Sequence, residues 1–396
     1  MKLHKDDALL FAVMLALASP ALPLIGNPTN LAALVLFITL MGHAPGRARQ
    51  RCLYLLALIT ALGSISTAVG AMKVVGSYSI NPNAFGPFFR VAVCACAIAS
   101  ANHPVDMQRR LLWVGCAASL FAVMQYFSPE VSEFTSAHYL AAERSSVFTE
   151  DFSGESIVRV IGVYENPSSV ALMALCLILV SVHSFAVGSL SRGTLALFVV
   201  VNLAAGILSL SKIFFAGLPI LLAQLLVLRF GKSAALSLLA LMAGAWATYA
   251  LESPLVDVVR YAVESALDPD AALKGRYLAD QEKVVSQSWL FGHGIASVQN
   301  VVINDSAYLV VGYLIGAFGA AVLGLHVAWW LWSGRRYVPF TLLLVLTALL
   351  LAGVGANSVL GYRVDIIVTA LGVSLCMASR RKDAGRARGN KESSTC

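Results

Sequence analysis

The sequence predicts an all-α, polytopic integral membrane protein with about 12 transmembrane helices. Of its 396 residues, 58% are hydrophobic and only 12% are charged, which is about half the charged fraction of a soluble globular domain. The mean hydropathy is +0.78, and long apolar runs such as 195–201, 220–227 and 342–351 recur along the chain. These observations argue against a water-soluble enzyme and favour a chain folded in lipid.

A helix needs about 20 consecutive apolar residues to cross the hydrocarbon core of a bilayer. Twelve stretches of the chain are candidates: 8–25, 29–46, 52–72, 84–101, 111–128, 166–187, 193–210, 213–229, 233–251, 306–332, 338–356 and 359–379. The first stretch also has features of a signal peptide, because lysines precede it and Ala16-Leu17-Ala18 lies near its end. Asp6 and Asp7 in the basic region argue against cleavage.

The positions of Lys and Arg orient these spans, because the cytoplasmic loops of membrane proteins are rich in both. With the N-terminus in the cytoplasm, 18 of the 28 Lys and Arg and five of the 21 acidic residues fall on the inner side. The net charge is then +13 inside and −6 outside. We therefore expect both termini to be cytoplasmic, with a basic cytoplasmic tail over 380–396. Cations spread between apolar blocks do not form the basic face of a nucleic-acid-binding protein.

Two connections are long, and both are external in this topology: about 129–165 and about 252–305. The first is acidic and rich in Ser. The second is expected to contain helices over 255–267 and from about 271 to 289, because its apolar residues follow helical spacing and Asp268-Pro269 interrupts them. We expect a single membrane domain over 1–396, with a site that faces outward in these loops.

The sequence contains little conventional catalytic chemistry. Six of the seven cysteines lie inside apolar stretches and the seventh is Cys396, so we interpret the six as packing residues without a disulfide framework. No spacing typical of a metal site or a nucleophile elbow is present, and we expect neither metal nor cofactor. His183, His326 and Asp365 lie near span ends, where a satisfied polar group is the simpler interpretation, and this weakens an ion-coupled transporter.

Three segments that carry polar residues fall on the outer side. The first reads R-V-I-G-V-Y-E-N-P from Arg159 to Pro167, and its Asn-Pro pair is typical of a helix start. The second contains Lys274 to Tyr277 and then 289–294, and the third runs from 304 to 319. Each segment also has a plainer interpretation as interfacial charge, i,i+4 pairing, helix capping or close helix packing.

In order and placement, these motifs resemble the O-antigen polymerase and ligase superfamily. The motifs are R-x-x-G-x-x-x-N-P at Arg159–Pro167, G-R at Gly275-Arg276, hydrophobic-G-x-G at Phe291–Gly294, and D-S-x-x-L-x6-G-x-x-G at Asp305–Gly319. The ligase branch of the family usually has His-Asn where this chain has Asp305-Ser306, which favours the Wzy-type polymerase branch. Relatives often carry Arg at the position of Lys212.

The resemblance implies a metal-independent glycosyltransferase with a GT-C-like fold in the bacterial inner membrane. Its donor would be a glycan on undecaprenyl diphosphate, and its product an O-antigen or exopolysaccharide built from repeat units at the outer face. A chain-length regulator and a flippase are the implied partners. One alternative is ligase-type transfer of finished glycan to a lipid or protein. Another, from a different class, is a lipid-linked oligosaccharide flippase or transporter.

The departing lipid diphosphate requires positive charge, and Arg presents a planar fork that suits phosphate. Arg159 and Arg276 are the expected diphosphate ligands, with Lys212 as a third cation. A base for the acceptor hydroxyl is also required. Asp305 is the first choice for that base, from its match to the family's His or Asp position, followed by Glu165 and His293. The residues expected to contact sugars, with an interfacial aromatic belt as the alternative, are Tyr164, Tyr277 and Trp289.

Overall fold

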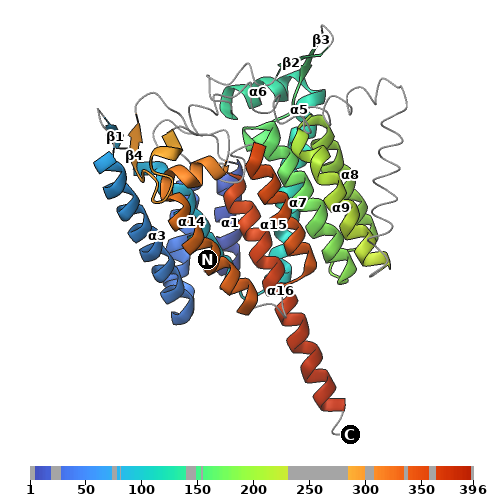
Figure 1. Ribbon diagram of the computed structural model, residues 1–396. Coiled ribbons are helices and arrows are strands. Elements are labelled where there is room, and N and C mark those ends of the chain that lie inside the picture. The colour runs from blue at the N-terminus through green and yellow to red at the C-terminus, as the bar shows by residue number, and fades with distance from the viewer. Residues whose placement is uncertain are drawn as a thin grey trace. The chain divides into compact units, whose positions relative to one another are not determined.

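The computed structural model describes residues 5–18, 28–73, 78–80, 82–139, 149–152, 155–230, 284–298, 307–333, 338–355 and 363–393 (Figure 1). Helices dominate these ranges, as the sequence predicts. Four are long and apolar enough to cross a membrane: α3 (Gly46–Lys73), α5 (Pro104–Phe127), α7 (Pro167–Ala186) and α14 (Ala307–Ser333). The expectation of a helical membrane protein is met at this level.

The remaining apolar helices coincide with further predicted spans. They are α1 (Lys5–Ala18), α2 (Pro28–His43), α4 (Gly86–Ala99), α8 (Arg192–Leu208), α9 (Lys212–Phe230), α15 (Phe340–Gly355) and α16 (Val364–Ser393). The predicted span 233–251 lies outside the described residues. Helix α16 continues beyond its apolar part through most of the basic tail.

The first long connection contains regular structure that the sequence reading did not anticipate. Helix α6 (Pro129–Tyr139) follows α5 directly, and β2 (Thr149–Phe152) pairs with β3 (Glu155–Val158) in antiparallel register. A second small ribbon joins β1 (Tyr78–Ile80) to β4 (Ala296–Val298). The expectation of an all-α chain therefore needs two short ribbons added within the described residues. The helix predicted for 255–267 lies outside those residues, and so does the part of the helix predicted for about 271–289 that precedes residue 284, while residues 284–287 are helical.

By its internal contacts the chain divides into two compact units. Unit 1 comprises Met1–Leu111, Ala279–Leu343 and Asp365–Cys396, and unit 2 comprises Leu112–Leu278 and Leu344–Val364. The expectation of a single membrane domain stays a prediction.

Helix α7 is the central helix of unit 2. Its most apolar window is 83% buried inside the structure, against 28% for the corresponding windows of α3 and α14. Helices α8 and α9 pack against it, and Ala171, Ala174 and Leu175 of α7 form a core with Phe214 of α9. A helix that is apolar on every side requires such enclosure. The end of α7 therefore has a fixed position within the unit.

Helix α14 of unit 1 is broken at Gly316, where φ is 62° and ψ is −176°. The segment 288–295 fills this break with its backbone. Its N–H groups at His293 and Gly294 donate to the carbonyls of Tyr313 and Leu314. In the other direction, the N–H groups of 317 and 318 donate to the carbonyls of 289 and 290, each at 2.8 Å. The polar groups freed by the break are thus satisfied, which a broken helix requires in lipid.

Arg90 and Asp365 form a buried ion pair in unit 1. Arg90 Nη2 lies 2.8 Å from Asp365 Oδ2, its Nη1 donates to Asn30 Oδ1 at 3.0 Å, and Asp365 Oδ1 accepts the N–H of Ile366 at 2.7 Å. Asp365 is therefore a satisfied buried group, as the sequence interpretation expects. The six cysteines within the described residues are free and buried, which confirms their interpretation as packing residues.

Candidate functional site

The segment from Arg159 to Pro167 is fixed against unit 2 through its backbone. Gln125 near the end of α5 accepts hydrogen bonds with its single Oε1 from the N–H groups of Ile161 and Gly162, both at 2.9 Å. The N–H of Val160 donates to the carbonyl of Leu208, the last residue of α8, at 3.2 Å. The buried side-chain amide of Gln125 thus satisfies backbone N–H groups that a neighbouring strand would otherwise satisfy.

Gly162 is required by two independent constraints. Its φ is +50°, in the left-handed region that side chains disfavour. A Cβ at this position would also lie 2.8 Å from the Cβ of Ala122 on α5. The glycine of the R-x-x-G motif therefore allows the segment to turn while it touches α5.

Asn166 and Pro167 start α7 as the sequence predicts. The Asn166 side chain accepts from the N–H of Ser168 at 2.8 Å, and proline occupies the first turn. This capping satisfies one of the free N–H groups at the helix start. Glu165 is therefore held directly in front of the N-terminus of the buried helix α7.

Glu165 forms an ion pair with Arg363, the residue that precedes α16. Arg363 Nη2 and Nε lie 2.8 Å and 2.9 Å from the same oxygen, Glu165 Oε1. The guanidinium carbon also lies 4.8 Å from the ring centroid of Tyr139, at the end of α6. Burial raises the pKa of the Tyr139 phenol and the Arg363 cation opposes that rise, so the ring is a neutral cation–π partner at neutral pH.

The two members of this pair differ in exposure. The Arg363 side chain is 1% exposed and that of Glu165 is 27% exposed. Within the described part of the chain, Glu165 Oε2 makes no hydrogen bond. The Arg363 end of the pair is therefore buried, while the Glu165 carboxylate reaches the surface.

Arg159 lies beside the turn that joins α8 to α9. Its Nε donates to the carbonyl of Ser209 at 3.2 Å. The same turn contains Leu210 at a positive φ of 47° and leads to Lys212, the first residue of α9. The turn and the R-x-x-G segment, 50 residues apart in sequence, are thus neighbours in unit 2, as a shared site of Arg159 and Lys212 requires. The Lys212 side chain lies outside the described part of the structure.

Three further residues of the expected site also lie outside the described residues. They are the expected base Asp305, the expected diphosphate ligand Arg276 and the expected sugar contact Tyr277. Their roles stay predictions.

His293 and Tyr164 are placed where their expected roles do not fit. His293 is 0% exposed: its Nε2 lies 2.9 Å from the carbonyl of Val284, and its ring stacks on Tyr313. Tyr164 is 3% exposed. A base for an external hydroxyl and a platform for a sugar both need access to the surface, so we correct both assignments to packing roles. Trp289, by contrast, is 62% exposed, and its expected contact with sugar stays a prediction.

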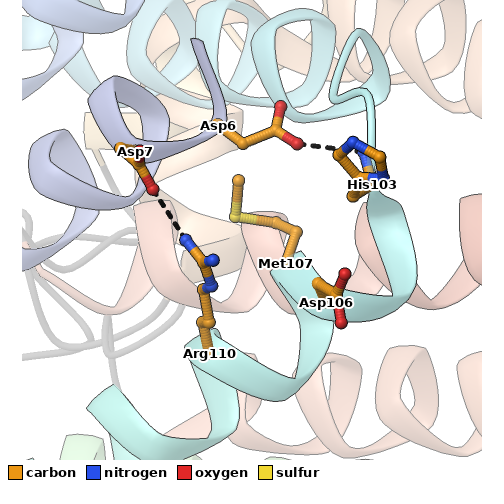
Figure 2. Close-up of a pocket in the computed structure, with 6 residues that line it drawn as sticks. All are labelled: Asp6, Asp7, His103, Asp106, Met107 and Arg110. Carbon is orange, nitrogen blue, oxygen red and sulfur yellow. Dashed lines mark hydrogen bonds and ion pairs between the residues drawn. The ribbon is translucent and has the colours of Figure 1, made fainter. Parts of the chain in front are cut away.

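A hollow of about 280 Å³ in unit 1 offers no alternative site (Figure 2). Two of its three acidic residues, Asp6 and Asp7, are already engaged. The carboxylate of Asp6 accepts the N–H groups of Asn102 and His103, each at 2.9 Å, just before α5 begins, and Asp7 pairs with Arg110 at 2.7 Å. These acids thus have structural partners. Among the described residues, no group of three or more His, Cys, Asp and Glu side chains is placed to hold a metal ion.

Sequence reasoning counted Arg363 only as an outer charge and did not consider Tyr139. One signal for Arg363 was available, because Arg363 and Asp365 are two opposite charges near the start of an apolar span, where unpaired charge is costly. For Tyr139, no local pattern indicates that the end of α6 meets residue 363.

No protein-family model matches the chain, and no curated protein matches it in sequence.

Proposed function

We propose that this protein is a Wzy-type polysaccharide polymerase that joins oligosaccharide repeat units carried on undecaprenyl diphosphate. The observation that carries the proposal is the carboxylate of Glu165, held by Arg363 at the start of α7 and six residues from Arg159. The order of motifs between 159 and 319 supports the same assignment. The proposal includes a GT-C-like fold with twelve spans, both termini in the cytoplasm, and a site at the outer face of the bacterial inner membrane.

In the proposed reaction, a hydroxyl of the lipid-linked acceptor unit attacks the anomeric carbon of the donor glycan. A new C–O bond forms while the bond from that carbon to the diphosphate oxygen breaks. The hydroxyl proton passes to Glu165 Oε2, and the lipid diphosphate leaves with the electron pair of the broken bond. A well-placed general base contributes about 10²- to 10⁴-fold to such a step.

The leaving diphosphate accumulates negative charge, so fixed cations stabilise the transition state more than the substrate. Arg159 takes this role in our proposal, with Arg276 and Lys212 as further cations. Asp305 remains the alternative base. The proposal needs no metal and no cofactor, and a chain-length regulator and a flippase are its expected partners.

Replacement of the carboxylate tests the proposal. In a strain that lacks the gene, single repeat units should accumulate, and a plasmid-borne Glu165→Gln variant should leave them unextended at normal protein levels. Glu130→Gln is a matched control, because Glu130 lies on α6 in the same connection and its carboxylate accepts from the neighbouring Ser128 at 2.7 Å. Gel analysis of the glycan gives the chain length.

Three outcomes would contradict the proposal in different ways. Long polymer in the Glu165→Gln strain would remove Glu165 from the site. Full-length polymer that accumulates on undecaprenyl diphosphate in the deletion strain would indicate a ligase instead. Repeat units trapped on the inner leaflet would indicate a flippase. Extension of lipid-linked repeats by purified protein in detergent, without a gradient, would exclude that last alternative.

A further inference from the structure

Among the described residues, Arg363 is one of two arginines that are almost fully enclosed, with 2% of its surface exposed. Taking a guanidinium out of water costs several kcal/mol unless paired groups compensate it. Its charge is met by the Glu165 carboxylate and by the face of Tyr139. These contacts fix the guanidinium within unit 2, so that it is a rigid support for the Glu165 carboxylate.

The geometry of the pair is asymmetric. In a fork-to-fork pair an arginine binds both carboxylate oxygens, whereas here Nε donates to Glu165 Oε1 at 2.9 Å and Nη2 lies 2.8 Å from the same oxygen. Arg363 thus holds the carboxylate by one oxygen and leaves Oε2 without a hydrogen bond within the described part of the chain. Glu165 itself has a positive φ of 62°, a strained conformation for a residue with a side chain. The backbone and Arg363 together determine where Oε2 points.

We propose that Arg363 is a positioning residue, which holds the Glu165 carboxylate by one oxygen so that the other is aimed at the acceptor hydroxyl. This inference rests on the proposed polymerase function. Arg363 acts through Glu165 and touches no reacting atom. A shift of about 1 Å in a catalytic group can cost about 100-fold in rate, so the turnover number of the reaction should depend on Arg363 while substrate affinity does not.

The test compares purified Arg363→Gln and Arg363→Lys proteins with wild type in a lipid-linked repeat extension assay. We expect Arg363→Gln to lower kcat roughly 100-fold with KM within about twofold. Arg363→Lys should recover part of that loss, because it restores the charge but supplies a point donor in place of a planar guanidinium. In a Glu165→Gln background, Arg363→Gln should cost little more, since the two residues act as one unit.

Arg90→Gln is the matched control for stability. Arg90 is a second buried arginine, paired with Asp365 at 2.8 Å, and it has no part in the proposed chemistry. Its loss should lower thermal stability in detergent, as should the loss of Arg363, but should leave kcat per folded molecule unchanged.

The outcomes separate this inference from the function on which it rests. If wild-type protein does not extend lipid-linked repeats, the polymerase proposal fails. If Glu165→Gln is inactive while folded Arg363→Gln retains the wild-type kcat, the polymerase proposal stands and the positioning role is wrong. An equal fall in kcat for Arg90→Gln and Arg363→Gln would also overturn the positioning role, because general loss of structure would then explain both.

Discussion

A few residues of unit 2 form the candidate site on an otherwise apolar helix bundle. Gln125, Gly162 and Asn166 hold the segment before α7, and each does so through the backbone of its neighbours. Glu165 and Arg363 then supply the charge. Uncharged residues thus fix the backbone segment that carries Glu165.

At the residue scale, we expect Gly162→Ala to destabilise the protein by roughly 1–3 kcal/mol, because the substitution adds backbone strain and a contact with Ala122. Thermal unfolding in detergent measures the effect. Gly188→Ala is the matched control, since Gly188 has a φ of +79° but, among the described residues, no atom within 4 Å of its Cβ position. Equal costs at the two sites would show that the contact with α5 contributes nothing.

At the scale of elements, the break in α14 explains why two glycine motifs occur together in this chain. A Cβ at Gly316 would lie 2.5 Å from the carbonyl oxygen of Leu290, and one at Gly292 would lie 2.7 Å from the N of Gly316. The hydrophobic-G-x-G and G-x-x-G patterns therefore meet at a contact between two backbones. This contact at a helix break differs from the packing of one helix against another that the plainer interpretation of Gly316 expects.

The same contact gives a prediction for α14. Gly316→Ala should lower the thermal stability of the protein more than any other glycine-to-alanine change in this helix, because neither backbone can move away without loss of the hydrogen bonds that fill the break. Gly324→Ala serves as the control, since no atom of the part of the chain that the structure describes lies within 4 Å of its Cβ position. A helical glycine in open space should gain about 0.5–1 kcal/mol on this change. Similar melting temperatures for the two variants would contradict the role assigned to the break.

At the scale of the whole molecule, the distribution of charge predicts the orientation in the membrane. Cys396→Ser protein is a suitable background for labelling, because the six remaining cysteines are buried. A membrane-impermeant maleimide should label Glu130→Cys on α6 in spheroplasts, and Gln50→Cys at the start of α3 only after permeabilisation. Both positions are exposed in the structure. The reverse pattern would overturn the topology and, with it, an external site.

Helices were predictable here because membrane spans are a local property of sequence. A run of about 20 apolar residues must satisfy its backbone internally, so hydropathy locates it. Helix α6 carried a signal that was overlooked: Ser128 accepts from the N–H of Val131, and Pro129 begins the helix. The two ribbons carried none of comparable strength, since strands of three or four residues leave little periodicity to detect.

The residues of the candidate site were also predictable from the sequence only in part. Arg159 and the Asn166-Pro167 helix start were recognisable because their residue types and spacing have a local meaning. The burial of His293 and Tyr164 was not, since a polar side chain beside an apolar run has the same sequence context whether it faces the surface or the interior.

The sequence by itself determined that this chain is helical and apolar, where most of its helices lie, and which segments carry the polar motifs. Only the tertiary structure decided that Glu165 meets Arg363 across 198 positions of sequence, and that the segment 288–295 fills the break in α14. The physical reason is that the composition and periodicity of a segment reflect the solvent that surrounds it. An ion pair or a backbone contact depends on which distant segment lies beside it, and no local pattern encodes that neighbour.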